Sequence, residues 1–139
     1  MFQDQLMHLI RSTRNYARGV IFWNVALDQN SSPKLNGVDP NGVNRGLITI
    51  RSDVNDDVKY ESGYYSMGHF SKFVNPDAFV ITSDSYQDYL ESVAFINPDN
   101  TIVVVVSNRL KEPKNVKINW NNNYILFSLD SYETVTLKW

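Results

Sequence analysis

From residue 78 to the end of the chain, apolar and polar residues follow the two-residue period of a β-strand. Val116, Ile118 and Trp120 alternate with Lys117 and Asn119, and the last residues of the chain alternate in the same way. Such alternation places one face of a strand in the core and the other in water. The pattern therefore predicts a series of strands, over residues 78–82, 89–97, 101–108, 115–120, 124–129 and 133–139.

The connections between these strands are rich in turn-forming residues, such as Pro98-Asp99-Asn100 and Asn121-Asn122-Asn123. Residues 102–106 are apolar throughout, as expected for a central strand, because such a run left in water would promote aggregation. Short strands at this spacing predict an antiparallel β-sandwich.

The front of the chain has a different pattern. Apolar residues recur at helical spacing and predict a helix over residues 3–16. Residues 19–27 form an apolar run interrupted only by Asn24, which predicts a strand covered on both faces. A helix, a short turn and a buried strand make one α/β unit. In α/β barrels the loops that follow the strands carry the functional residues, so Trp23, Asn24 and Asp28 stand where a site would be built.

A second helix is predicted over residues 64–73, where Met67, Phe70 and Phe73 recur at steps of three before Asn75-Pro76 ends the helix. His69 lies within this helix. No nucleophile or base motif in the sequence accompanies it, so a packing role is favoured over catalysis.

Between the two halves the sequence is mostly polar. Residues 47–50 predict a short strand, and Asp39-Pro40-Asn41-Gly42 predicts turns in the loop before it. Residues 51–59 contain Asp53, Asp56 and Asp57 but lack the glycine and the bidentate glutamate of a calcium-binding loop. A solvated turn is therefore predicted there, and neither a metal nor a cofactor is expected.

The composition narrows the classes of function. A net charge of −2 without a basic cluster argues against a nucleic-acid partner. The absence of cysteine excludes disulfides and thiolate metal sites but leaves the compartment open. No apolar run has the length of an export signal or a transmembrane segment. Aromatic residues make up 13% of the chain, which favours strands and also suits a protein that handles sugars.

Three blocks of sequence, in this order, resemble the C-terminal part of glycoside hydrolase family 30, the family of glucosylceramidase-like enzymes. The first is FWNVALD at residues 22–28 with RGLITI at 45–50, and the second is YYSMGHFSKF at 64–73. The third comprises residues 92–99, 103–109 and 132–139. The resemblance implies a mainly β chain with two parts: residues 1–75 would be the incomplete end of a (β/α)8 barrel (helix, strand, loop and helix), and residues 76–139 the C-terminal β-sandwich domain.

The resemblance also implies a parent activity, which is retaining hydrolysis of a β-glycosidic bond in a glucosylceramide-like substrate or a β-glucan. Retention requires two carboxyl groups, and in the family both are glutamates at the ends of barrel strands four and seven. The chain begins after strand seven, and none of its glutamates follows a barrel-type strand. No catalytic residue is therefore expected in it, and the chain alone is predicted to be inactive.

The same resemblance assigns Trp23 to the wall of the sugar pocket in an intact barrel. An aromatic face packs against sugar C–H groups while polar neighbours such as Asn24 and Asp28 bond the hydroxyls. The family has members that are secreted or lysosomal, which leaves the compartment of this chain unpredicted.

Other interpretations remain open. The chain could be a free-standing carbohydrate-binding or structural β-sandwich module that uses Trp120, Tyr124 or Trp139, although the alternating pattern places these residues in the core. It could also be the product of a split or truncated gene. In that case the strand at residues 19–27 would lack its sheet neighbours and would need a separate chain that carries the rest of the barrel.

Overall fold

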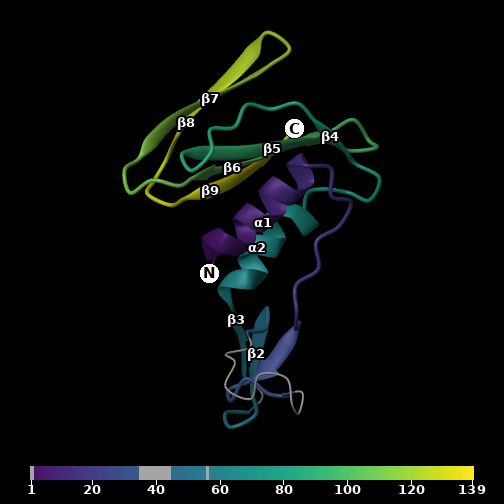
Figure 1. Ribbon diagram of the computed structural model, residues 1–139, viewed down its shortest axis with the longest axis vertical. Helices are drawn as coiled ribbons and strands as arrows, with labels where there is room; N and C mark the ends of the chain where they lie inside the picture. Colours follow the sequence, from purple (N-terminus) through teal and green to yellow (C-terminus); the bar gives the residue numbers. More distant parts are fainter. Residues whose placement is uncertain (1, 35–44, 56) are drawn as a thin grey trace.

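The computed structural model describes residues 2–34, 45–55 and 57–139, and the predicted turns at residues 39–42 lie outside this part of the chain. The described residues form two helices and nine strands (Figure 1). Their bounds are α1 Phe2–Arg14, β1 Ala26–Asp28, β2 Ile48–Arg51, β3 Asp57–Tyr60, α2 Ser62–Ser71, β4 Phe79–Ile81, β5 Leu90–Ile96, β6 Ile102–Asn108, β7 Lys114–Trp120, β8 Asn123–Leu129 and β9 Thr134–Lys138. Both predicted helices and all of the strands predicted in the rear half are confirmed.

The centre of the molecule is a four-stranded antiparallel sheet in the order β4-β5-β6-β9. The helices α1 and α2 cover one face of this sheet, and the hairpin of β7 and β8 covers the other (Figure 1). The predicted mainly β, antiparallel sandwich is therefore confirmed, with one layer of the sandwich supplied by a two-stranded hairpin.

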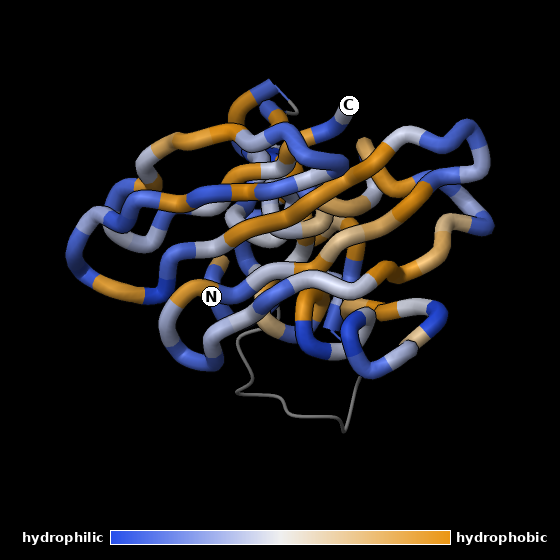
Figure 2. The backbone as a smooth tube through the Cα atoms, turned by 90° about the horizontal axis from the view of Figure 1, so that it is seen from above, coloured by the Kyte–Doolittle hydropathy of each residue, from blue (hydrophilic) through white to orange (hydrophobic). Residues whose placement is uncertain are grey.

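Strand β6 is apolar throughout because it lies between two separate cores. Val103 and Val105 pack with the helices, whereas Ile102, Val104 and Val106 pack under the hairpin. All residues of this strand are buried. Viewed from above, apolar segments occupy the middle of the molecule and polar segments the turns at its edge (Figure 2). The expected central position of residues 102–106 is thus confirmed, and its cause is burial on both faces.

The hairpin turn shows how local sequence sets the register of the second layer. Trp120 pairs with Asn123, which leaves Asn121 and Asn122 as a two-residue turn. Both turn residues have positive φ, at 47° and 64°. Two-residue turns between twisted strands favour this conformation, and asparagine tolerates it better than most residues do.

The first helix is attached to the sheet by polar contacts as well as by its apolar face. Arg11 Nε donates to Glu91 Oε2 at 3.0 Å, and the side chain of Glu91 is 3% exposed. Arg14 Nη1 donates to the carbonyl oxygens of Ser83 at 3.0 Å and Ser92 at 2.9 Å. Helix α1 is therefore fixed on β5 by two guanidinium groups.

The second helix is joined to the sheet at its C-terminal end. The amide of Asn75 donates to Asn97 Oδ1 at 2.9 Å, and Asn97 Nδ2 donates to the carbonyl oxygen of Phe73 at 3.0 Å. His69 Nδ1 lies 2.8 Å from Thr136 Oγ1, and burial lowers the pKa of the imidazole. These contacts give His69 the packing position that was predicted. The helices and the sheet share one core, so their packing marks no boundary at residue 75. The division of the chain there stays a prediction.

A smaller sheet in the order β1-β2-β3 projects away from the sandwich (Figure 1). Strand β2 confirms the short strand predicted at residues 47–50, but the prediction of a turn over residues 51–59 was wrong in part. Strand β3 pairs antiparallel with β2, and all four of its residues are exposed, with Asp57 and Lys59 alternating with Val58 and Tyr60. Two apolar positions are too short a pattern to predict a strand.

The strand predicted over residues 19–27 is also corrected. Only Ala26–Asp28 form a strand, paired in parallel with β2. A strand needs a neighbour to receive its backbone hydrogen bonds, and among the described residues only β2 lies beside this segment.

Candidate functional site

Residues 20–25 lead from α1 to β1 without regular secondary structure, with bends at Trp23 and Val25, and their side chains alternate between half-buried and exposed. Val20 and Phe22 pack against the core between the helices and the sheet. Ile21, Trp23 and Val25 are instead exposed, at 96%, 70% and 70%. We call these three residues the outer row.

The segment is unusual because the residues on its exposed side are as apolar as those on its packed side. A segment that faces water on one side normally carries polar residues there. A contiguous exposed apolar surface marks a site that a partner or ligand covers. The chain therefore has the pattern of a strand covered on both faces, but only one face is covered within the described residues.

Asn24 has an unpaired amide inside this segment. Its φ is 66°, a left-handed conformation that asparagine tolerates better than most residues do. Its Nδ2 is buried and has no hydrogen-bond partner among the described residues. Buried amide groups are nearly always paired. An unpaired amide is therefore expected of a residue whose partner comes from outside the described segment.

Asp28 stabilises the turn that follows β1. Its Oδ1 accepts hydrogen bonds from the amides of Asn30 and Ser32, both at 2.8 Å. Asp28 is half-buried, and neither cavity described below is lined by Trp23, Asn24 or Asp28. The structure thus places these three predicted residues along one segment rather than around one pocket, and their binding role stays a prediction.

The small sheet depends on a glycine at the close approach of two strands. A Cβ atom added to Gly46 would lie 2.7 Å from the carbonyl oxygen of Ile48 and 3.2 Å from that of Val25. The carbonyl oxygen of Val25 also accepts the amides of Leu47 and Ile48, at 2.9 and 3.0 Å. This close approach gives a physical reason for a glycine at position 46.

The described carboxylates mostly serve structural roles. Glu61 accepts from Thr49 Oγ1 at 2.8 Å and pairs with Lys59, whose hydrogen bond lowers the pKa of Glu61. Glu91 pairs with Arg11, which lowers the pKa of Glu91. Glu133 Oε2 accepts the amide of Asp130 at 2.6 Å. Each of these three carboxylates is held by a structural contact. In the described ranges no group of three or more histidine, acidic or cysteine residues could hold a metal ion.

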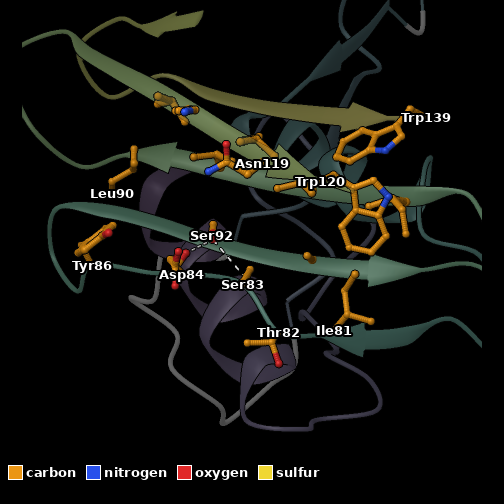
Figure 3. Close-up of a pocket in the computed structure, with 17 residues that line it drawn as sticks. Ile81, Thr82, Ser83, Asp84, Tyr86, Leu90, Ser92, Asn119, Trp120 and Trp139 are labelled. Carbon is orange, nitrogen blue, oxygen red and sulfur yellow. Dashed lines mark hydrogen bonds between the residues drawn. The ribbon is translucent and has the colours of Figure 1, made fainter. Parts of the chain in front are cut away.

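A second candidate site lies between the layers of the sandwich. Two adjoining cavities, of about 270 and 360 Å³, share the lining residues Ile118, Trp120 and Trp139. The labelled side chains of the first cavity extend from polar residues beside β4 and β5 to the two indole rings (Figure 3). The second cavity also includes Tyr124.

The burial predicted for these aromatic residues was wrong. Trp120, Tyr124 and Trp139 are 37%, 63% and 45% exposed. The alternating pattern gives the face of a strand but not what covers it. Trp120 and Tyr124 lie beside the turn of the hairpin, and Trp139 follows the edge strand β9. The sequence pattern identifies all three aromatic residues but does not show that they are exposed.

The fold defines a β-sandwich backed by helices and joined to part of an α/β unit. Residues 77–137 match the glycosyl hydrolase family 30 beta sandwich domain. The chain is 31% identical to an endo-1,6-β-D-glucanase of Aspergillus fumigatus over 130 residues, which are 90% of this chain and 22% of that enzyme.

Two further comparisons agree with this match. The chain is 34% identical to the lysosomal acid glucosylceramidase of Mus musculus over 108 residues, 75% of this chain and 19% of that enzyme. It superposes on the crystal structure of SrfJ from Salmonella typhimurium with a TM-score of 0.90 at 29% identity, over 99% of this chain and 30% of that one.

The chain belongs to glycosyl hydrolase family 30 and corresponds to the C-terminal part of such an enzyme. It spans about a fifth of the length of the curated relatives that it matches. Neither described helix is long and apolar enough to cross a membrane.

Proposed function

We propose that this chain is the supporting, C-terminal part of a retaining β-glycosidase and supplies one wall of its sugar pocket without supplying the catalytic carboxylates. The outer row carries this proposal. Ile21, Trp23 and Val25 present an apolar surface of the kind that the neighbouring strands and helices of a barrel would cover. The remainder of the barrel, in the same polypeptide or in a separate one, is the partner that this surface requires.

In the assembled enzyme Trp23 and Asn24 contact the sugar. An exposed indole offers a flat face to sugar C–H groups, and an unpaired buried amide offers a donor to a hydroxyl. Asp28 acts indirectly, because its carboxylate holds the turn after β1 and thereby fixes the end of the segment. Two carboxyl groups about 5–5.5 Å apart, which retaining hydrolysis needs, come from the remainder of the barrel.

The substrate class favoured is a β-glucan. The relative named as an endo-1,6-β-D-glucanase matches 90% of the chain, whereas the match to the glucosylceramidase covers 75%. A glucosylceramide-like substrate is the alternative within the same reaction class. In either case a glucosyl unit is the group that Trp23 contacts.

A chimeric enzyme tests the role of Trp23. The matching C-terminal fifth of the Aspergillus glucanase is replaced by this chain, and hydrolysis of β-1,6-glucan is measured. The chimera is expected to be active, and Trp23→Ala is expected to lower its kcat/KM by roughly tenfold or more, because stacking on the sugar is lost.

Tyr89→Ala is the matched control, because Tyr89 is an exposed aromatic residue, 58% accessible, on the sandwich. Its kcat/KM should equal that of the unaltered chimera. A folded Trp23→Ala chimera that retains full kcat/KM would contradict the assignment of Trp23 to the sugar pocket.

A further inference from the structure

We propose that the sandwich carries a second carbohydrate-binding site at the turn end of the hairpin of β7 and β8, formed by Trp120 and Trp139 with Tyr124 at its rim. Its ligand is a chain of β-linked glucosyl units. The choice of glucan rests on the proposed function, whereas the position of the site rests on the structure alone.

The site is concave and lies at one end of the space between the layers. The cavity that contains all three aromatic residues has a volume of about 360 Å³. This is within the range of roughly 300–1,000 Å³ typical of small-molecule sites. It continues past Trp120 and Trp139 into the neighbouring cavity of about 270 Å³. A linear oligosaccharide can therefore extend from one cavity into the next.

The aromatic side chains project from ordered strands. The amide of Trp139 donates to the carbonyl oxygen of Ile102 at 3.1 Å, and the amide of Ile102 donates to that of Trp139 at 2.8 Å. Trp120 pairs with Asn123 at the end of the hairpin. Tyr124 pairs with Asn119, the position next to Trp120, so its ring lies at the rim, where the ammonium group of Lys117 is 4.5 Å from the ring centre. Rigid side chains bind with a small entropy cost, because little motion is lost on binding.

The chemistry of the lining favours a sugar over a purely apolar ligand. Asn123 and Lys138 line the larger cavity together with the aromatic residues, and Thr82, Ser83 and Asp84 line the smaller one. A glucosyl ring has apolar C–H faces, which stack on indole rings, and a rim of hydroxyl groups, which bond amide, hydroxyl, carboxylate and ammonium groups. The site therefore presents both kinds of contact that a glucosyl unit needs.

This site is separate from the outer row. All residues that line the two cavities lie between positions 81 and 139. The hairpin covers the face of the main sheet opposite the helices, from which the segment of Trp23 departs (Figure 1). A glucan held there would stay attached to the enzyme without occupying the barrel pocket.

The test is isothermal titration calorimetry, in which gentiotetraose, a tetramer of β-1,6-linked glucose, is added to the purified 139-residue chain. Saturable binding is expected, and Trp120→Ala and Trp139→Ala should each weaken it by roughly tenfold or more. Tyr89→Ala, at an exposed aromatic residue that lines neither cavity, should bind as the unaltered chain does. Maltotetraose, which has α-linkages, should bind more weakly than gentiotetraose.

Tyr124→Ala guards against a loss of fold, because Tyr124 is 63% exposed and its removal leaves the strand pairing intact. It should weaken binding while the thermal unfolding temperature stays unchanged. The proposal is overturned if no binding is seen, if the three sandwich variants bind normally, or if sedimentation shows a dimer that buries these aromatic residues. Binding abolished by Trp23→Ala alone would also overturn it, although that result would support the proposed barrel pocket.

Discussion

Replacing Arg11 with alanine is expected to lower the free energy of unfolding by roughly 2–4 kcal/mol. Arg11 forms a two-point contact with Glu91, whose side chain is only 3% exposed. Without the guanidinium, the carboxylate stays buried and keeps the amide of Asp88, at 3.1 Å, as its other hydrogen-bond donor. The cost comes from the uncompensated charge, so it should be much larger than for an exposed pair. Urea unfolding of the Arg11→Ala variant and of the unaltered chain measures this loss of stability.

Arg51→Ala is the control, because Arg51 and Asp53 form a surface pair in which both side chains are more than 40% exposed. Its removal should change stability by less than about 1 kcal/mol. The pH dependence gives a second readout. Arg11 lowers the pKa of Glu91 below its ordinary value of 4.5, so this pair stabilises the fold above pH 4.5. Its contribution is lost as the pH falls below that value. An Arg11→Ala variant as stable as Arg51→Ala would refute this account of the pair.

The second large effect is expected at Asn108, at the end of β6. Its Nδ2 donates to the carbonyl oxygens of Glu112 at 2.8 Å and Asp130 at 2.9 Å, and its Oδ1 accepts the amide of Leu110 at 3.0 Å. The side chain therefore joins the connections to both strands of the hairpin. Asn108→Ala leaves these groups without their partner inside the protein and should lower the free energy of unfolding by roughly 2–4 kcal/mol.

Asn115 provides the comparison, since it is an exposed asparagine on β7. Asn115→Ala should alter stability by less than about 0.5 kcal/mol. If calorimetric unfolding gave the same temperature for both variants, the bonds of Asn108 would not be what holds the hairpin over the sheet.

The sandwich was largely predictable because its signals are local. The period of two, the apolar run of β6 and the asparagines of the hairpin turn each report the conformation of their own residues. The predicted strands accordingly agree with β4 to β9 within one or two residues at each end. The sequence pattern cannot show that β6 faces helices on one side and a hairpin on the other, because that depends on contacts between distant parts of the chain.

The candidate sites were harder to predict for the same reason. An apolar run at residues 19–27 indicates a buried strand, but its burial requires neighbours that the described residues do not supply, so Trp23 is exposed. The alternation around Trp120 and Trp139 indicates a core position, but Trp120 lies at the turn end of the hairpin and Trp139 follows the edge strand β9, so both are partly exposed. In both cases the sequence pattern shows on which side of the strand a residue lies, but not which other residues cover that side.

The central claim is that this chain supports a glycosidase without supplying its catalytic carboxylates. The most direct test is hydrolysis of an aryl β-glucoside by the purified chain alone. The claim predicts no release of the aryl group above that seen with heat-denatured protein. Turnover that is lost on Glu61→Gln or Glu91→Gln, in variants that remain folded, would contradict it.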